Sequence, residues 1–459
     1  MLWHALFLKN LKMNDLIIIG AGPGGYEMAA EAAQHGLKVV LVERDRLGGT
    51  CLNRGCIPTK TLCRNAEVLD LLHDAAQFGV AVGDVTVDYS QAFERKEQVV
   101  DQLRDGVAML MNHENITLVQ GEARIVSATG VAVGDEVYEA RHLVIATGSV
   151  PRALPIEGVE LAVTSDEILA MKQLPASLCI IGGGVIGMEF ASIFHSYGVE
   201  VTVVEFCKEI LPPFDKDIAK RLRTTLSKRG VNIITQAGVT ALHKQGDEIL
   251  VAFDHKGKPK ELAAQCVLMS VGRKPVLPAG AEQLGVNTER GAIVVDQNMM
   301  TSLAGVYAIG DVNGLCMLAH AATAQGRVAL AHILGHPTDI DLNVVPSAVF
   351  TRPEAAMVGL TEEQCAQRGL AVEVKKSFFR SNGKAVAMGE TDGLVKLIAD
   401  AESHEVLGCH ICGAHAADLI VEVALAMSAH LPVERMASAI HGHPTLSEVV
   451  AACAAQFFC

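Results

Sequence analysis

The feature that most constrains the fold is a pattern of strand, glycine turn, helix and strand that occurs twice in the 459 residues. The first copy, DLIIIGAGPGGYEMAAEAAQHGLKVVLVE, places Gly20, Gly22 and Gly25 between an apolar run and an Ala-rich stretch. The first glycine permits a tight turn, the second lets a pyrophosphate approach the backbone, and the third packs helix on strand. Glu43 ends the next apolar run, 23 residues after Gly20, where it can accept a hydrogen bond from a ribose hydroxyl. This copy predicts a dinucleotide-binding βαβ unit.

The second copy, SLCIIGGGVIGMEFASIFHSYGVEVTVVE, has Gly182, Gly184 and Gly187 in the turn and Glu205 again 23 residues after the first glycine. A repeat separated by about 160 residues is a duplicated domain and not a solenoid period. One chain is therefore expected to bind two dinucleotides. The carboxylate of Glu205 can accept from a free 2′-hydroxyl and repels a 2′-phosphate, which favours NAD, although Lys208 nearby leaves some tolerance for NADP.

The composition agrees with this fold class. Half of the residues are apolar, 20% are charged and 42 are glycine, a balance typical of α/β proteins with many tight turns. At this length, roughly three or four domains are expected. With 52 acidic and 38 basic residues, the net charge of −14 disfavours a broad nucleic-acid surface but not a local phosphate pocket. We expect no nucleic-acid partner.

The first twelve residues, MLWHALFLKNLK, are apolar but too few to span a bilayer, and they lack the pattern of a signal peptide. We expect them to be a disordered extension, and Met13 offers an alternative translation start. Twelve cysteines without a secretory segment indicate a reducing compartment, where most thiols are small core residues and a disulfide is catalytic. We therefore expect a cytoplasmic protein with no membrane attachment.

The stretch GTCLNRGC places Cys51 and Cys56 five residues apart. On a regular helix their Cα atoms would be about 8 to 9 Å apart, whereas a disulfide needs about 4.4 to 6.8 Å. Gly55 and Pro58 would permit a distorted turn, and a small strained loop of this kind is readily reduced. A metal site would need a second ligand pair, which Cys63 does not complete, so we predict no metal. Two inert core thiols remain an alternative.

A second pair, Cys409 and Cys412 in CHIC, matches a C-x-x-C motif by letters only. The stretch has neither a partner pair nor a Gly-Pro redox context. We expect both to be buried strand thiols.

A dithiol must lose a proton before it can attack a disulfide, because free thiols are mostly protonated at neutral pH. The stretch HGHPTLSE supplies a candidate base in His443, directly before Pro444, and Glu448 could orient its imidazole. His441 is a neighbouring alternative as the base. A second alternative is that the His–Glu pair has only a structural role.

Eight stretches together resemble the flavoprotein disulfide reductases, and the resemblance covers residue 13 to the C-terminus. They are the two nucleotide units, GGTCLNRGCIPTK, ATG at 146–148, VGRKP at 271–275, VYAIGD ending at Asp311, MLAH at 317–320 and HPTLSE at 443–448. The resemblance implies an α/β fold with two Rossmann-like domains, one for FAD and one for NAD, followed by a C-terminal α+β dimerisation domain.

The resemblance also implies which residues hold each cofactor. The residues for FAD are Gly20, Gly22, Gly25, Glu43, Gly49, Thr50, Lys60, Ala123, Thr147, Gly148, Asp311, Met317, Ala319 and His320. The residues for NAD are Gly182, Gly184, Val185, Ile186, Gly187, Glu189, Glu205, Val239 and Gly272.

The catalytic roles are likewise implied by the resemblance. Cys51 would exchange with the dithiol substrate, and Cys56 would lie beneath the flavin as a charge-transfer thiolate. Lys60 would lie near the flavin N5 and pair with Glu189, although without the resemblance Lys60 reads equally well as a solvated helix charge. The C-terminal domain would form a homodimer, so that His443 and its acid serve the cysteine pair of the other subunit.

Within the family, the motifs are most similar to members that oxidise protein-bound dihydrolipoamide and reduce NAD. This implies lipoyl domains of 2-oxo acid dehydrogenase complexes, or the H protein of the glycine cleavage system, as partners. The alternatives are a reductase of the glutathione or mercuric type and a non-catalytic redox-sensing subunit. Glu205 disfavours the NADPH-dependent glutathione enzymes, the separation of Cys453 and Cys459 disfavours mercuric reductase, and two nucleotide sites disfavour a sensor.

The motifs also place the expected domain boundaries. We predict an FAD domain at 13–150, an NAD domain at 151–270, a central segment at 271–345 that completes the flavin site, and an interface domain at 346–459. The last begins with PSAVFTRPEAAMVGLTEEQ, whose two prolines mark a change of chemistry.

Overall fold

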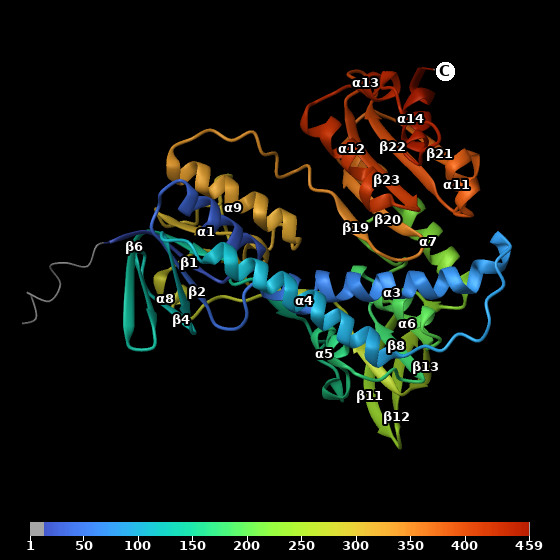
Figure 1. Ribbon diagram of the computed structural model, residues 1–459, viewed down its shortest axis with the longest axis horizontal. Coiled ribbons are helices and arrows are strands. Elements are labelled where there is room, and N and C mark those ends of the chain that lie inside the picture. The colour runs from blue at the N-terminus through green and yellow to red at the C-terminus, as the bar shows by residue number, and fades with distance from the viewer. Residues whose placement is uncertain (1–12, 459) are drawn as a thin grey trace, which may run out of the picture. The chain divides into compact units, whose positions relative to one another are not determined.

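The computed structural model describes residues 13–458, shown in Figure 1. The expectations about residues 1–12, and the position of Cys459, lie outside this range. The described chain forms two compact units. Unit 1 contains the described residues up to Pro58, then Glu97–Val150 and Arg273–Leu342, and unit 2 contains Thr59–Lys96, Pro151–Gly272 and Asn343 onward.

Unit 1 is built on a sheet with the strand order β3-β2-β1-β6-β5-β4, and β18 pairs with β6. The pairs β1–β2, β1–β6, β2–β3 and β6–β18 are parallel, whereas β4–β5 and β5–β6 are antiparallel. The strands are β1 (Asn14–Ile19), β2 (Val39–Glu43), β3 (Ile116–Gln120), β4 (Ala123–Ser127), β5 (Gly130–Val133), β6 (Glu136–Ile145) and β18 (Val306–Ala308). Two short pairs accompany them, namely β7 (Ser149–Pro151) with β15 (Arg273–Pro275), and β16 (Thr288–Glu289) with β17 (Ala292–Ile293).

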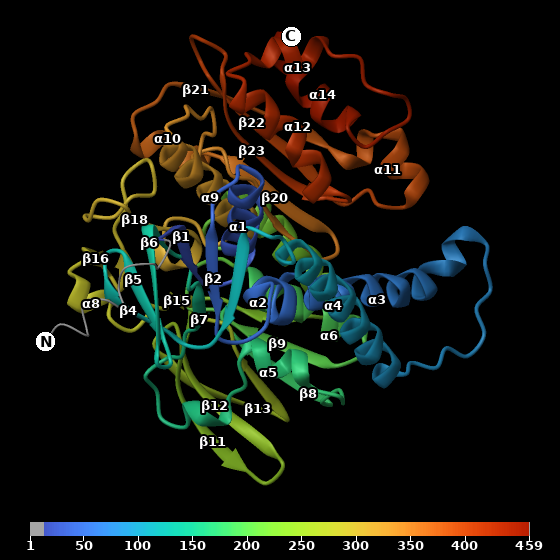
Figure 2. The ribbon, with the colours of Figure 1, turned by 60° about the vertical axis from the view of Figure 1, so that its left-hand side comes forward.

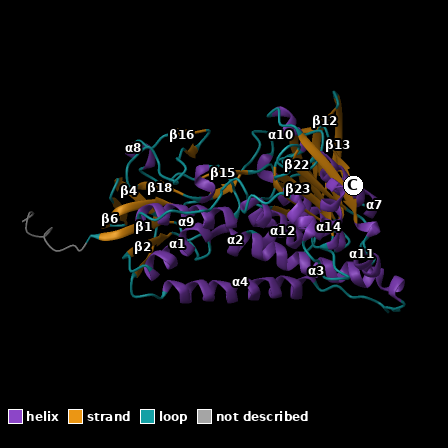
Figure 3. Ribbon diagram, turned by 90° about the horizontal axis from the view of Figure 1, so that it is seen from above, coloured by secondary structure: helices purple, strands orange, loops and turns teal. Residues whose placement is uncertain are grey.

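The apolar run of β1 is buried on both faces of this sheet. Leu16 and Ile18 join the core that contains helices α1 (Pro23–Gln34) and α9 (Ala319–Leu334). Ile17 and Ile19 join the core on the other face, with side chains from β4 and β5. Successive side chains of a strand point to opposite faces, so a strand covered on both sides reads as a continuous apolar run. Figure 3 shows α1 and α9, which pack against each other, beside these strands.

Unit 2 contains three sheets. The first is parallel, with the order β10-β9-β8-β14, which repeats the arrangement β3-β2-β1-β6 of unit 1. The other two are antiparallel, with the orders β11-β12-β13 and β19-β20-β23-β22-β21 (Figure 2). The strands are β8 (Ser177–Ile181), β9 (Glu200–Val204), β10 (Asn232–Ile234), β11 (Ala237–Gln245), β12 (Glu248–His255), β13 (Lys258–Ala264), β14 (Cys266–Met269), β19 (Ser347–Val349), β20 (Glu354–Gly359), β21 (Val372–Phe378), β22 (Leu394–Asp400) and β23 (Val406–Gly413).

The predicted α/β class, with two Rossmann-like sheets and a C-terminal α+β part, is therefore confirmed. The remaining helices are α2 (Gly49–Arg54), α3 (Cys56–Asp74), α4 (Tyr89–Met111), α5 (Ser165–Ala170), α6 (Val185–Ser196), α7 (Lys216–Arg229), α8 (Ala281–Leu284), α10 (Glu362–Gln367), α11 (Gly383–Met388), α12 (Ala416–Ser428), α13 (Val433–Ser438) and α14 (Glu448–Ala455). The division into four domains stays a prediction.

Cys409 and Cys412 lie on β23 and are fully buried, which confirms the expectation of buried strand thiols. Within residues 13–458, no helix combines the length and the apolar composition that crossing a membrane requires. In the same range, no cluster of three or more His, Cys, Asp or Glu side chains could hold a metal ion.

Candidate active site

The first glycine of each nucleotide unit has the same left-handed backbone, with φ of 104° at both Gly20 and Gly182. A Cβ at Gly20 would lie 2.4 Å from the carbonyl oxygen of Ala146, and one at Gly182 would lie 2.6 Å from that of Ser270. Both backbone geometry and space therefore require glycine here.

The third glycine of each unit allows the helix to approach the strand end. A Cβ at Gly25 would lie 1.9 Å from the Gly20 carbonyl oxygen, and one at Gly187 would lie 2.1 Å from that of Gly182. Because these contacts are with backbone, no side-chain movement could relieve them. The role assigned to the third glycine from the sequence agrees with this packing.

The second glycine of each unit caps a helix and faces open space. Gly22 precedes α1 with ψ of −178°, and Gly184 precedes α6 with ψ of −175°. A Cβ at Gly184 would meet nothing within 4 Å, and one at Gly22 would meet only the Cα of Gly49, at 4.0 Å. Each position is thus a cradle that a side chain would fill. The first backbone N–H groups of a helix have no carbonyl partner within the helix, and this suits the pyrophosphate of a dinucleotide.

The terminal acids of the two units are buried and bind the glycine turns. Glu43 accepts from the backbone N–H of Ala21 at 2.7 Å and from that of Asp45 at 2.8 Å. Glu205 accepts from the N–H of Gly183 and from that of Cys207, both at 2.5 Å. Each carboxylate oxygen has a second acceptor site, which can serve a ribose hydroxyl. The sequence predicted that these acids bind a ribose hydroxyl. It did not indicate that their carboxylates also accept hydrogen bonds from the backbone of the glycine turn.

Asp311, predicted for FAD, is the end of a chain of hydrogen bonds in unit 1. Ser149 Oγ donates to Asp311 Oδ2 at 2.5 Å, and Arg273 Nε donates to Ser149 Oγ at 2.7 Å. A further nitrogen of Arg273 donates to the Ser149 carbonyl at 2.8 Å. Arg273 lies within VGRKP and Ser149 directly follows the ATG stretch, but nothing in the sequence indicated that these two residues pair.

The other residues predicted for the cofactors are spread over several elements. Thr147 donates to the Val276 carbonyl at 2.5 Å. For the remaining predicted residues, the structure gives the burial of each side chain or backbone position. Ala123 is buried, His320 and Gly272 are exposed, and the others are half-buried. The others are Gly49, Thr50, Gly148, Met317 and Ala319 for FAD, and Val185, Ile186 and Val239 for NAD. Their contacts with the cofactors stay predictions.

The helix break predicted between the two cysteines is present. Helix α2 ends at Arg54, Gly55 adopts φ −143° and ψ −112°, and α3 begins at Cys56. A Cβ at Gly55 would lie 2.9 Å from the Thr50 carbonyl oxygen and 3.2 Å from the Cα of Cys51. Glycine therefore lets the chain fold back over the turn that carries Cys51.

Lys60 on α3 forms an ion pair with Glu189 on α6, with Nζ 2.9 Å from each carboxylate oxygen. Glu189 is only 3% exposed and also accepts from the backbone N–H of Phe350 at 3.0 Å. The Lys60 ammonium lies 4.6 Å from the centre of the Phe350 ring, and the thiol of Cys63 donates to the Phe350 carbonyl at 3.3 Å. Burial, followed by the charge of Glu189, raises the pKa of the Cys63 thiol far above its ordinary value, so this thiol is inert.

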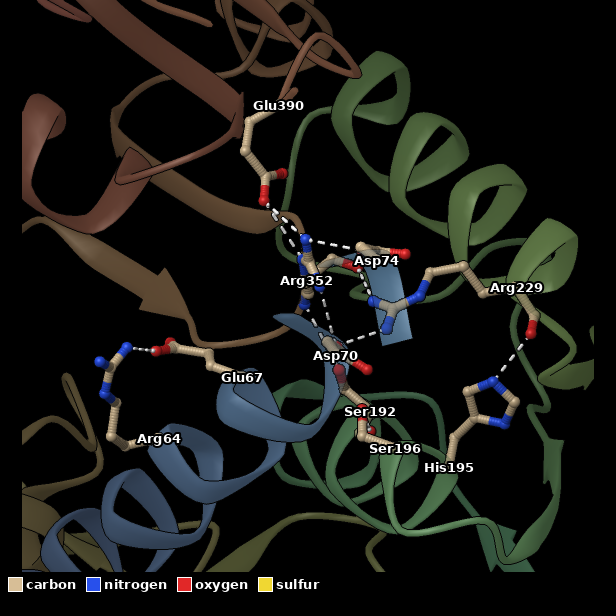
Figure 4. A network of polar contacts seen from close by, with 10 residues as sticks. All are labelled: Arg64, Glu67, Asp70, Asp74, Ser192, His195, Ser196, Arg229, Arg352 and Glu390. Atoms are coloured by element: carbon tan, nitrogen blue, oxygen red, sulfur yellow. Dashed lines mark hydrogen bonds and ion pairs between the residues drawn. The ribbon is translucent and has the colours of Figure 1, made fainter. Parts of the chain in front are cut away.

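An ionic network around Arg352 supports the same segment (Figure 4). Its guanidinium lies 3.6 Å from Asp70 and 3.1 Å from Asp74, both on α3, and 2.9 Å from Glu390. Arg229 of α7 donates to the Arg352 carbonyl at 2.9 Å and to Asp70 at 2.5 Å. Sequence reasoning missed this network because its members lie far apart in the chain.

The candidate base forms the expected pair with its acid. His443 Nδ1 lies 3.0 Å from Glu448 Oε1, and the N–H of Thr445 donates to Glu448 Oε2 at 2.9 Å. The Thr445 N–H, followed by the His443 ring, lowers the pKa of the Glu448 carboxyl. The His443 side chain is 79% exposed. Glu448 can therefore fix the tautomer of the ring and leave Nε2 for proton transfer.

Two dinucleotide units, a cysteine pair at a helix break and an oriented histidine define the class. This combination is that of an oxidoreductase linking a thiol pair to a nicotinamide nucleotide.

Comparison with known proteins agrees with this class. Residues 14–326 match the pyridine nucleotide-disulphide oxidoreductase family, and residues 345–454 match its dimerisation domain. The chain belongs to this family. The family uses FAD and NAD, and the chain forms a homodimer.

Individual relatives are similar over nearly the whole chain. The chain is 42% identical to a dihydrolipoyl dehydrogenase of Chlamydia muridarum, over 95% of each protein. It is 40% identical to one from Bacillus subtilis, over 95% of this chain and 96% of the relative. Among solved structures, the HOCl-induced flavoprotein disulfide reductase RclA from Escherichia coli is similar, with a TM-score of 0.86, 31% identity and coverage of 96% and 99%.

Proposed function

We propose that the chain oxidises protein-bound dihydrolipoamide to lipoamide and reduces NAD to NADH. The observation that carries this proposal is the contact between His443 and Glu448, 3.0 Å apart. A dithiol substrate must be deprotonated before it can attack a disulfide, and an oriented imidazole is the group that does this at neutral pH. The full-length similarity to dihydrolipoyl dehydrogenases supports the choice of substrate.

The proton moves first. His443 Nε2 takes the proton of one substrate thiol, and Glu448 stabilises the imidazolium through Nδ1. In the homodimer, this histidine serves the cysteine pair of the other subunit. A monomer would then lack a complete site.

Sulfur exchange follows in two steps. The substrate thiolate attacks Sγ of Cys51 in the oxidised Cys51–Cys56 pair, the S–S bond breaks, and Cys56 leaves as a thiolate. The second substrate sulfur then attacks the mixed disulfide, which closes the lipoamide ring and releases Cys51. The substrate loses two electrons and the protein pair gains them.

When bound, FAD supplies the two-electron chemistry that connects the reduced cysteine pair to NAD. The first nucleotide unit would hold FAD through the cradle at Gly22, with Glu43 and Asp311 as polar contacts. The second would hold NAD through the cradle at Gly184 and through Glu205. Lys60, fixed by Glu189, would present its charge to the flavin.

The partners would be lipoyl domains of 2-oxo acid dehydrogenase complexes or the H protein of the glycine cleavage system. We place the reaction in the cytoplasm, because twelve cysteines and a pair that must be reducible suit a reducing compartment.

The substitution Cys56→Ser tests the assignment of the pair. It should abolish lipoamide-dependent NADH turnover and the long-wavelength absorbance of the reduced enzyme, because the leaving thiolate is removed. Cys63→Ser, on the same helix, is the matched control and should keep both, since that thiol is buried and inert. Normal turnover in Cys56→Ser would overturn the assignment, and an unsubstituted protein without turnover would favour a scaffold or sensor.

The substitution His443→Gln tests the base. It should slow dihydrolipoamide oxidation about 10²-fold or more, and it should leave NADH oxidation by an artificial acceptor much less affected. Equal loss in both reactions would contradict a role confined to the dithiol.

A further inference from the structure

Phe206 directly follows Glu205, the acid that ends the second nucleotide unit, and its side chain faces solvent. It is 80% exposed and is the most exposed phenylalanine within residues 13–458. Its ring lies beside the backbone of Gly238 on β11, where an added Cβ would be 3.4 Å from one ring carbon and 3.7 Å from another. These are ordinary contact distances. We call Phe206 and Gly238 together the aromatic ledge.

The ledge has a matched place in the first nucleotide unit. There the backbone N–H of Gly121 donates to the carbonyl of the terminal acid at 2.8 Å, and in the second unit the N–H of Ala237 donates to the carbonyl of its acid at 2.9 Å. The next residue along the chain is Glu122 in the first unit and Gly238 in the second. These two positions therefore lie at the same point of the repeated fold.

The first unit fills this place with charged side chains. Arg44, directly after the acid, pairs with Glu122 at 3.3 Å, and both side chains are more than half exposed. The second unit has Phe206 and Gly238 instead. Because the turn after the acid forms with an arginine in one unit, the fold does not require an aromatic ring there. The phenyl ring therefore has another reason to stand exposed over a bare glycine.

The ligand expected at this place has an aromatic end. Under the proposed function, the carboxylate of Glu205 accepts from a hydroxyl of the ribose that carries the adenine of NAD. The base is bonded to that sugar, so it lies within reach of the residue next to Glu205 in the chain. Adenine has two flat π-faces, and an aromatic side chain stacks on such a face without any hydrogen bond.

We propose that the adenine of NAD stacks on Phe206 and that Gly238 leaves the ring uncovered for this purpose. This inference rests on the proposed assignment of NAD to the second unit. Stacking removes apolar surface of both the base and the phenyl ring from water, which favours binding. The ring contacts the adenine end of the nucleotide and not the nicotinamide end. Phe206 is therefore a binding residue that sets affinity for NAD and leaves the chemical step unchanged.

The first test measures the binding of AMP, which carries the adenine and its ribose without the nicotinamide. The protein is the FAD-loaded homodimer, and the method is isothermal titration calorimetry. Phe206→Ala should weaken AMP binding about 10-fold, because the stacking face is lost. Phe206→Trp keeps a flat aromatic face, so its affinity should stay within about 2-fold of the parent protein. Met109→Ala removes another exposed apolar side chain, on α4, and should leave AMP binding unchanged.

A second measurement separates stacking from general disturbance of the unit. Phe206→Ala should raise KM for NAD about 10-fold with little change in kcat, whereas turnover with nicotinamide mononucleotide, which has no adenine, should equal that of the parent protein. Thermal unfolding should also be unchanged, because an exposed ring contributes little packing. In Phe206→Trp, AMP should quench the fluorescence of the introduced indole, with the unsubstituted protein, whose single tryptophan is Trp3, as the background.

The outcomes distinguish this inference from the proposed function. AMP binding that is undetectable in the parent protein, or equally tight in Phe206→Ala, would overturn the inference. A loss of turnover in Phe206→Ala that is the same with NAD and with nicotinamide mononucleotide would overturn it as well. AMP binding that depends on Phe206, in a protein that does not oxidise dihydrolipoamide, would overturn the proposed function alone.

Discussion

The two nucleotide units have the same turn and differ at one matched position on the helix that follows. Glu27 and Glu189 each stand two residues after the third glycine. Glu189 is buried, paired with Lys60, and accepts from the N–H of Phe350. Glu27 is half-buried beside Tyr26, where burial and then the charge of Glu27 raise the pKa of the phenol to about 12.

This difference shows that the glycine turn and the helix after it are constrained by different interactions. The backbone of the turn is set by the phosphate chemistry, which is the same for any dinucleotide, so both units need glycine at the same places. The helix side chains are set by what packs against them. The first helix packs on α9, where a Cβ at Gly24 would lie 3.1 Å from the Ala322 carbonyl oxygen. The helix of the second unit, α6, contacts Lys60 and Phe350 through Glu189, which forms an ion pair with Lys60.

The largest effect is expected from alanine at the third glycine of each unit. In Gly25→Ala and Gly187→Ala the new Cβ overlaps a backbone carbonyl, which costs about 1–3 kcal/mol or more and moves the helix off the strand. Gly25→Ala should yield protein that does not retain FAD, as measured by flavin absorbance after purification. Gly187→Ala should retain FAD and lose NAD-dependent turnover.

A matched control is Gly106→Ala within α4, where a Cβ would meet nothing within 4 Å. This change should leave cofactor binding intact and raise stability slightly, by about 0.5–1 kcal/mol. If Gly187→Ala lost FAD as readily as Gly25→Ala, the two units would not act as separate binding sites.

The next effect concerns the matched glutamates. Glu189→Gln leaves the Lys60 ammonium facing a neutral amide in a buried setting and should lower the free energy of unfolding by about 1–3 kcal/mol. Water screens part of this charge, because the Lys60 side chain is 33% exposed. Glu27→Gln should stay within about 0.5 kcal/mol of the parent protein. Thermal unfolding of the FAD-loaded enzyme measures both.

A double substitution separates the ion pair from general disruption. Lys60→Met combined with Glu189→Gln should recover part of the loss if the cost comes from an unpaired charge. Equal destabilisation by Glu27→Gln and Glu189→Gln would mean that the ion pair adds nothing to the second unit.

The shared part of the two units was predictable from the sequence because it depends on local backbone geometry. Glycine at Gly20 and Gly182 marks a φ that other residues rarely adopt, and an apolar run marks a strand wherever both faces are covered. The helix break at Gly55 was predictable for the same reason, since a helix cannot bring cysteines five residues apart within bonding distance.

The specialised part was not predictable from the residues alone. The pairing of Lys60 with Glu189 was implied only by the family resemblance. The two residues are 129 positions apart, and no sequence pattern around either one indicates the other as its partner. The contacts of Arg352 with Asp70 and Glu390 went unforeseen. Such contacts depend on which helices pack together, and periodicity along one segment carries no information about that.

A smaller effect is expected at the acid that ends the second unit. Glu205→Ala removes the acceptor of two backbone N–H groups and, under the proposed NAD site, of a ribose hydroxyl, so KM for NAD should rise about 10-fold, with little change in kcat. The preference for NAD over NADP should also fall, because the repulsion of a 2′-phosphate is lost. Steady-state assays with both nucleotides measure the two effects. The matched change Glu43→Ala should lower FAD retention and leave KM for NAD unchanged. A rise in KM for NAD in Glu43→Ala would contradict the assignment of the two acids to different nucleotides.

The smallest effect is expected at the residue two positions after the terminal acid of each unit. In both units its backbone N–H donates to that acid, but its side chain differs. Asp45 donates its N–H to Glu43, and its carboxylate also pairs with Arg54. Cys207 donates its N–H to Glu205, and its thiol is exposed. Cys207→Ser keeps the N–H, so KM for NAD should change by less than about 2-fold, whereas Asp45→Ala loses an exposed ion pair worth up to about 1 kcal/mol. A large rise in KM for Cys207→Ser would show that this side chain, and not only its backbone, takes part in binding NAD.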